Sequence, residues 1–216
     1  MTDVYSVHHP EALTITEAGG KTYRGANQEW YHTEWQQRAG CGPTTAAMLL
    51  AYLAATRAEL RGLYPSGSMD KEAFTAFMEE VWQFVTPGRR GLNSNHLFVS
   101  GVTAFAKERG IDLPVRELDI PRLRMARPSY DQCAAFLRTG LNADCPVAFL
   151  NFSRGRVANL DSWHWVPILS LEERSNGQAL CITLDGGRER TIDFRLWYQT
   201  SRGGGGLVYL PAELHV

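Results

Sequence analysis

Apolar residues along this 216-residue chain follow a helical period up to about residue 142 and a strand-like pattern after it. The run from Cys41 to about Glu59 leaves almost no polar face, which predicts a helix buried nearly all round. Three further segments place apolar residues at spacings of three and four, and they predict amphipathic helices over about 70–85, 94–110 and 129–141.

Beyond residue 145 the apolar runs are short and are separated by turns that contain Gly or Asn, which predicts strands at 145–151, 163–171, 179–184, 191–197 and 207–210. Helices first and strands later are typical of an α+β fold with segregated layers. We therefore expect one domain over residues 1–216. Its expected parts are an irregular segment at 1–35, a mainly helical part at 41–142 and a mainly β part, with an antiparallel sheet, at 145–212.

Composition narrows the class of protein. Apolar residues make up 44% and charged residues 21%, and the formal net charge is −1. These values are typical of a soluble globular domain and give no indication of nucleic-acid binding. No run approaches the ~18 apolar residues of a membrane helix, and the N-terminal residues lack the basic and apolar regions of a signal peptide. We expect a cytoplasmic protein that binds neither nucleic acid nor membrane, and the oligomeric state stays open.

No cluster of His, Cys or Asp has metal-ligand spacing, and no Gly-rich phosphate-binding loop occurs, so we expect neither a metal nor another cofactor. Four cysteines are widely spaced. One of them, Cys41, is the candidate for chemistry, and the others are expected to be small buried core residues: Cys133, Cys145 and Cys181.

Cys41 stands directly before Gly-Pro-Thr-Thr at the start of the most apolar helix. Proline is favoured in the first turn of a helix, so we expect Cys41 at the N-cap or one residue before it. The partial positive charge of a helix N-terminus favours thiolate over thiol, and the thiolate is the nucleophile. The alternative is a small packed residue with no reactivity.

A base for this thiol is found at His164, which begins an apolar strand between Trp163 and Trp165. A histidine there is partly desolvated and held rigidly, as a general base requires. The next predicted strand ends at Asp185, and pairing of the two strands brings its carboxylate within reach of the imidazole. The alternatives are a core histidine bonded to a carbonyl and an aspartate of an Asp-Gly turn.

The segment Gln37–Leu50, which contains Cys-Gly-Pro-Thr-Thr, resembles the nucleophile motif of the papain-like cysteine peptidase superfamily. It is most similar to stand-alone bacteriocin-processing (double-glycine) peptidase-like domains. In those proteins a His-aromatic-Val motif and an Asp at the end of the following strand come later, in the order of Cys41, His164 and Asp185 here. Gly186 stands where the family often has proline. The resemblance implies a papain-like fold with a buried nucleophile helix packed on an antiparallel sheet.

The resemblance also implies that a glutamine amide ahead of the cysteine donates to the oxyanion. The usual position, about six residues ahead, is occupied here by Trp35. Gln36 is therefore the candidate and Gln37 its rival, with the backbone N–H of Cys41 as the second donor.

Trp35, Gln37, Trp163 and Trp165 are candidate substrate-binding residues, and core packing is the alternative for the three tryptophans. The activity that the resemblance implies is hydrolysis of peptide or amide bonds through a thioester acyl-enzyme, with a peptide or small amide as substrate. An acyl transferase or transpeptidase that uses the same triad is one alternative. A non-catalytic peptide-binding module with the same fold is the other.

Overall fold

The computed structural model describes residues 2–211. Within that range a seven-stranded antiparallel sheet has the order β4-β9-β5-β6-β7-β8, and β1 also pairs with β6. Its strands are β1 Thr2–Ser6, β4 Arg116–Ile120, β5 Val147–Asn151, β6 His164–Arg174, β7 Ala179–Asp185, β8 Arg188–Asp193 and β9 Gly205–Tyr209. A separate hairpin joins β2 Thr14–Thr16 to β3 Thr22–Arg24. The predicted α+β class with an antiparallel sheet is confirmed.

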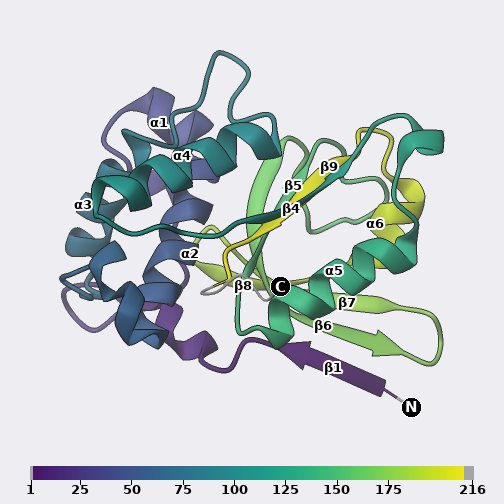
Figure 1. Ribbon diagram of the computed structural model, residues 1–216, viewed down its shortest axis with the longest axis horizontal. Coiled ribbons are helices and arrows are strands. Elements are labelled where there is room, and N and C mark those ends of the chain that lie inside the picture. The colour runs from purple at the N-terminus through teal and green to yellow at the C-terminus, as the bar shows by residue number, and fades with distance from the viewer. Residues whose placement is uncertain (1, 212–216) are drawn as a thin grey trace.

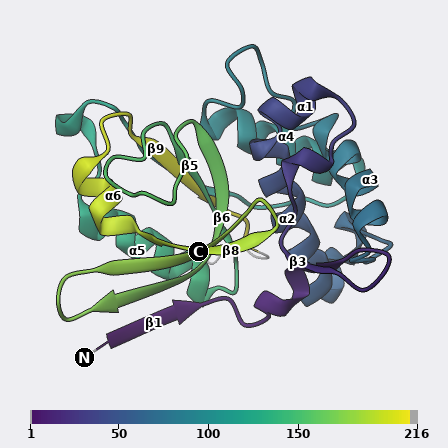
Figure 2. The same cartoon turned by 180° about the vertical axis from the view of Figure 1, so that it is seen from behind.

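Most helices gather at one side of the sheet, as Figures 1 and 2 show. They are α1 Glu34–Ala39, α2 Cys41–Thr56, α3 Lys71–Trp82 and α4 Asn95–Glu108. Two helices lie elsewhere against the sheet, α5 Tyr130–Asn142 and α6 Phe194–Thr200. In the part of the chain that the structure describes, four 3-10 turns connect these elements: η1 Pro10–Leu13, η2 Gln28–Trp30, η3 Ala58–Leu63 and η4 Arg124–Ala126.

Helix α2 lies between the other helices and the sheet, in contact with α3, α4, β5 and β6. Every residue from Gly42 to Ala54 is buried, which confirms the expectation from its nearly uniform apolar sequence. A helix buried on all sides is fixed in position by packing rather than by its own propensity. Its first residue is therefore held rigidly at the edge of the sheet.

The ends of the remaining predicted helices follow from capping residues. Asp70, Ser94 and Ser129 each accept a backbone N–H of the following first turn, which satisfies a donor that the helix itself leaves free. Ser129 forms a reciprocal capping box with Gln132. The observed helices begin within one residue of the predicted boundaries.

The boundaries of the three predicted parts are wrong in places. The segment 1–35 is not irregular, because β1 pairs with the second half of β6 and β2 pairs with β3. Strand β4 lies inside the predicted helical part and pairs with β9. Residue 212, where the prediction ended the β part, lies outside the described residues.

The predicted strand at 191–197 is half helix. Strand β8 ends at Asp193, whose carboxylate accepts the N–H of Leu196 at 2.9 Å and caps α6. Phe194 and Trp197 then lie on one buried face of that helix, in contact with Phe149 of β5. None of the helices within residues 2–211 is long and apolar enough to cross a membrane.

Candidate active site

Cys41 is the first residue of α2, one position beyond the later of the two predicted places, and so lies inside the helix rather than at its cap. Gly40 is the N-cap, and the first helical hydrogen bond runs from Thr44 N–H to Gly40 O at 2.9 Å. The N–H groups of Cys41 and Gly42 therefore have no acceptor within the helix. Pro43, in the same turn, has no N–H to leave free. The sulfur thus sits at an end of α2 where two backbone donors point outward.

The glycines on both sides of Cys41 are required by close packing. A Cβ at Gly40 would lie 2.4 Å from Gln36 O and 2.6 Å from the Tyr31 ring. A Cβ at Gly42 would lie 2.5 Å from Leu92 Cδ2. All three distances are far shorter than van der Waals contact, so the Gly-Cys-Gly sequence is what lets this helix start approach its neighbours.

His164 and Asp185 meet because β6 and β7 are antiparallel neighbours, so that the start of one lies beside the end of the other. His164 Nε2 lies 2.8 Å from Asp185 Oδ1. Because Nε2 is engaged with Asp185, Nδ1 is the ring nitrogen left for chemistry, and His164 and Cys41 line the same small cavity, close enough for Cys41 to raise the pKa of the imidazole. The structure thus brings the three predicted residues together in the order Cys41, His164, Asp185.

His164 and Asp185 each favour the charged form of the other. Burial alone would lower the pKa of His164, but the hydrogen bond to Asp185 and the contact with Cys41 outweigh it and raise the pKa to about 10. Burial would raise the pKa of Asp185, but the His164 hydrogen bond and charge and the nearby Arg190 lower it. Arg190 Nε lies 3.3 Å from Asp185 Oδ2 without the alignment of a hydrogen bond, so it acts as an ion-pair partner. An ionised Asp185 therefore accepts a hydrogen bond from the Nε2–H of His164.

The stability of the fold should depend on pH through this pair. Because the folded-state pKa of His164 is raised, its contribution to the free energy of unfolding is fully present below the unfolded pKa of about 6.5 and disappears as pH rises towards 10. We expect wild type to exceed His164→Gln by on the order of 2 kcal/mol near pH 6.5, and the gap to shrink by pH 9.5. Urea denaturation at both pH values measures the gap. A gap that stays constant or widens would contradict the assignment.

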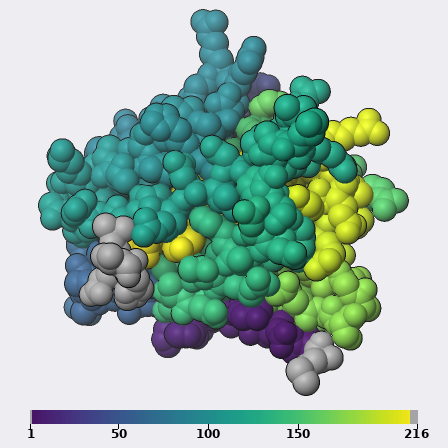
Figure 3. All heavy atoms as spheres, turned by 45° about the vertical axis from the view of Figure 1, so that its right-hand side comes forward, coloured from purple at the N-terminus to yellow at the C-terminus, as the bar shows by residue number. Residues whose placement is uncertain are grey.

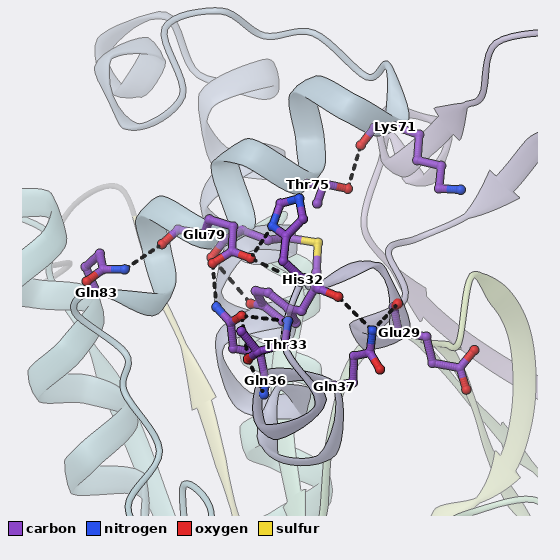
Figure 4. Close-up of polar contacts among 11 residues, drawn as sticks. Glu29, His32, Thr33, Gln36, Gln37, Lys71, Thr75, Glu79 and Gln83 are labelled. Carbon is purple, nitrogen blue, oxygen red and sulfur yellow. Dashed lines mark hydrogen bonds and ion pairs between the residues drawn. The ribbon is translucent and has the colours of Figure 1, made fainter.

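The structure places Gln36 away from Cys41. Its Oε1 accepts from the N–H and hydroxyl of Thr33, at 3.2 and 2.8 Å, and its Nε2 donates to Glu79 (Figure 4). Glu79 also lies 2.9 Å from His32 Nδ1. Gln36 therefore caps α1 and anchors it to α3, which argues against its predicted role as the oxyanion donor.

Gln37 does not face Cys41 either. Its Nε2 donates to Tyr31 O at 2.8 Å and to Glu29 O at 3.3 Å, so it fastens α1 to the preceding turn (Figure 4). It lines none of the hollows beside the cysteine. This placement argues against both the oxyanion role and the substrate contact considered for Gln37.

Gln28 is the glutamine that lies beside the candidate triad, and it was not among the residues predicted from the sequence. It lines a cavity of about 20 Å³ together with Cys41, His164 and Asp185. That volume is enough for about one water molecule. Gln28 Nε2 donates one proton to Gln37 O at 2.6 Å, and an amide nitrogen carries a second. No local sequence pattern identifies Gln28, because α1 lies between it and Cys41 in the sequence and only the tertiary fold brings the two together.

A groove of about 640 Å³ opens on the other side of Cys41. Its apolar walls come from α1, from the segment after α3 and from the ends of β5 and β6, and include Trp35, Leu92, Leu150, Phe152 and Trp163. Trp35 and Trp163 are 46% and 61% exposed, which is unusual for tryptophan and typical of a binding surface. Both were predicted to bind substrate, and the structure places both at the groove.

The backbone at Trp163 is strained. It has φ of +58°, a conformation that costs a bulky side chain energy and is held only where the surroundings enforce it. Its ring packs edge-on against Phe152, with centroids 5.0 Å apart. This strained residue lies directly before His164, and its side chain lines the groove.

Trp165 has a different environment from Trp163. Its side chain is buried, its indole N–H donates to Leu92 O at 2.6 Å, and its ring stacks on Phe98 at 4.6 Å. These contacts hold Leu92, a wall of the groove, in place. They argue against the substrate contact that was predicted for Trp165.

Within residues 2–211 no group of three or more His, Cys, Asp or Glu side chains is arranged to hold a metal ion. No protein-family model matches the sequence, and no curated protein matches it.

Proposed function

We propose that this protein is a cysteine-dependent hydrolase of peptide or amide bonds, with the fold arrangement of the papain-like cysteine peptidases. The observation that carries the proposal is that Cys41, at the start of a buried helix, lines one small cavity with His164 and Asp185, and that His164 is hydrogen-bonded to Asp185. A nucleophile, a base and a group that orients the base are the parts that covalent acyl transfer requires. The packing of that helix on an antiparallel sheet that carries the other two residues supports the papain-like arrangement.

In the proposed reaction the Cys41 thiolate attacks the carbonyl carbon of the substrate and forms a C–S bond. The carbonyl oxygen becomes an oxyanion. Protonated His164 then gives its Nδ1 proton to the leaving nitrogen as the C–N bond breaks, which leaves a thioester on Cys41. Neutral His164 next takes a proton from water, whose oxygen attacks the thioester, and the carboxylic acid and the thiolate–imidazolium pair are restored. Throughout the reaction Asp185 accepts a hydrogen bond from the Nε2–H of His164 and stabilises the imidazolium.

The donors proposed for the oxyanion are the backbone N–H of Cys41 and the second Nε2 proton of Gln28. The N–H has no acceptor within α2, and Gln28 lines the same small cavity as the triad. Fixed donors of this kind stabilise the tetrahedral intermediate without reorganisation.

A matched pair of glutamine variants tests the choice of donor. We expect Gln28→Ala to lower turnover about 100-fold, as loss of one oxyanion donor does elsewhere, and to lower the free energy of unfolding by only about 1 kcal/mol through its lost hydrogen bond to Gln37 O. Gln36→Ala should lower the free energy of unfolding by about 1 kcal/mol through the lost cap, and change turnover by less than about threefold. Urea denaturation and steady-state rates measure both. The reverse pattern would return the donor role to Gln36.

A peptide library made from a digested proteome tests the function itself. The purified protein should generate new peptide termini that mass spectrometry detects, and Cys41→Ala should generate none. Addition of a primary amine distinguishes the fates of the thioester, since a transferase would yield amide products in place of acids. Equal cleavage by wild type and Cys41→Ala would overturn the proposal.

A further inference from the structure

The charged side chains that line the groove are all basic. Beside Cys41 the groove is lined by Arg38, Arg89 and Arg90, and no Asp or Glu lines it. A second hollow of about 450 Å³ shares Phe152 and Trp163 with the first and adds Arg122 and Arg202, again with no acidic residue. The chain as a whole has a net charge of only −1, with 22 basic and 23 acidic residues. Five arginines without an acid are therefore a local concentration of positive charge.

The arginines come from separate parts of the chain. Arg38 lies on α1, Arg89 and Arg90 on the loop after α3, Arg122 after β4 and Arg202 after α6. The loop that carries Arg89 and Arg90 projects from the molecule beside α1 and α4 in Figures 1 and 2, and side chains in the same colour range stand out at the top of Figure 3. All five side chains are exposed at the rims.

These guanidinium groups are not neutralised by the protein. Within residues 2–211 none of the five forms an ion pair or a side-chain hydrogen bond, whereas Arg109 and Arg138 each pair with a glutamate at 2.7 Å. Arginine presents a planar fork of donors that matches a carboxylate in a bidentate manner. A rim of unpaired arginines above an apolar floor favours a ligand with carboxylates around an apolar or aromatic group.

We propose that the substrate is an acidic peptide. Its Asp or Glu side chains would pair with the arginine rim, and an apolar residue between them would lie on Trp163 and Phe152. The two adjoining hollows together exceed the size of a small-molecule pocket and suit an extended segment of chain. This inference rests on the proposed function, because it assigns a substrate class to the groove of the same cysteine.

Two alkylating reagents that differ only in charge test the rim. Iodoacetate is an anion and iodoacetamide is neutral, and both alkylate a thiolate by the same displacement. The ratio of their rates at Cys41, divided by the ratio for Cys41 in the urea-unfolded protein, isolates the effect of the fold. At about 10 mM salt, where the Debye length is about 30 Å, we expect this normalised ratio to fall about threefold in the double variant Arg89→Gln, Arg90→Gln.

Arg61→Gln is the matched control. Arg61 is exposed and lies in η3, beyond the far end of the 16-residue helix α2, about 24 Å from its start. It should leave the ratio unchanged. An equal ratio in wild type and the double variant, or an equal fall with Arg61→Gln, would overturn the inference.

A second arm tests the peptide. Two blocked peptides of identical length, one with glutamate and one with glutamine around a central phenylalanine, compete with iodoacetamide for Cys41. We expect the glutamate peptide to halve the labelling rate at a concentration at least about fivefold lower, and the advantage to disappear in the double variant. Equal protection by both peptides, no protection by either, or equal protection by inorganic phosphate would overturn the acidic-peptide assignment. Failure of the proposed function is distinguishable, because wild type and Cys41→Ala would then act equally on the peptide library, whatever the outcome of the labelling experiments.

Discussion

Iodoacetamide in limiting amount will modify Cys41 at least about 100-fold faster than any other cysteine of the native protein. Cys41 is partly exposed at the groove, whereas the side chains of Cys133, Cys145 and Cys181 are fully buried. Burial raises the pKa of Cys133 to about 12 and also raises the pKa values of Cys145 and Cys181. Each unit of that shift lowers the thiolate fraction about tenfold at neutral pH, and the thiolate is the species that reacts.

Digestion and mass spectrometry of the four cysteine peptides over a time course measure the individual rates. The same protein in urea is the control, since unfolding should bring all four rates within a few-fold of one another. If the native protein labels all four cysteines alike, the proposed role of Cys41 is contradicted.

Loss of the imidazole should have the second large effect. We expect His164→Ala to lower turnover by about 10³-fold or more, because His164 is the histidine that lines the small cavity at Cys41. Asp185→Asn should lower it by about 10²-fold or more, since an amide neither stabilises the imidazolium nor fixes the tautomer. Steady-state rates on a peptide found in the library measure both.

His96→Ala is the matched control for these variants. His96 is exposed on α4 and forms no side-chain hydrogen bond within residues 2–211, so its removal should leave the rate within about twofold of wild type. Urea denaturation of all three variants separates lost chemistry from lost folding. A His164→Ala protein that is folded and retains near-wild-type rates would contradict the assignment.

Helices α2, α3, α4 and α5 were predictable because their signals are local, whereas α1 and α6 were not predicted. The uniform apolar sequence of α2 and the caps at Asp70, Ser94 and Ser129 lie within the segments that they define. Strand β1 was not predictable in this way. Its burial pattern is almost entirely exposed, and it is a strand because the second half of β6 offers it a partner. Pairing of that kind depends on the tertiary fold.

The same distinction applies to the candidate site. Cys41, His164 and Asp185 lie at ends of elements that the sequence pattern identifies, so their meeting followed from one correct pairing of strands. The glutamine could not be placed by its distance from the cysteine. Gln36 is drawn to Glu79 on α3, and Gln28 comes to Cys41 through the turn that precedes α1. Only the packing of α1 decides between them.

Acylation of Cys41 by p-nitrophenyl acetate tests the central claim most directly. The account predicts a burst of nitrophenol of about one equivalent, an added acetyl group on the peptide that contains Cys41, and its loss as the thioester hydrolyses. Cys41→Ala should show no burst, and His164→Ala should acylate far more slowly. Acetyl groups spread over lysines with Cys41 unmodified, or an undiminished burst without the sulfur, would contradict it.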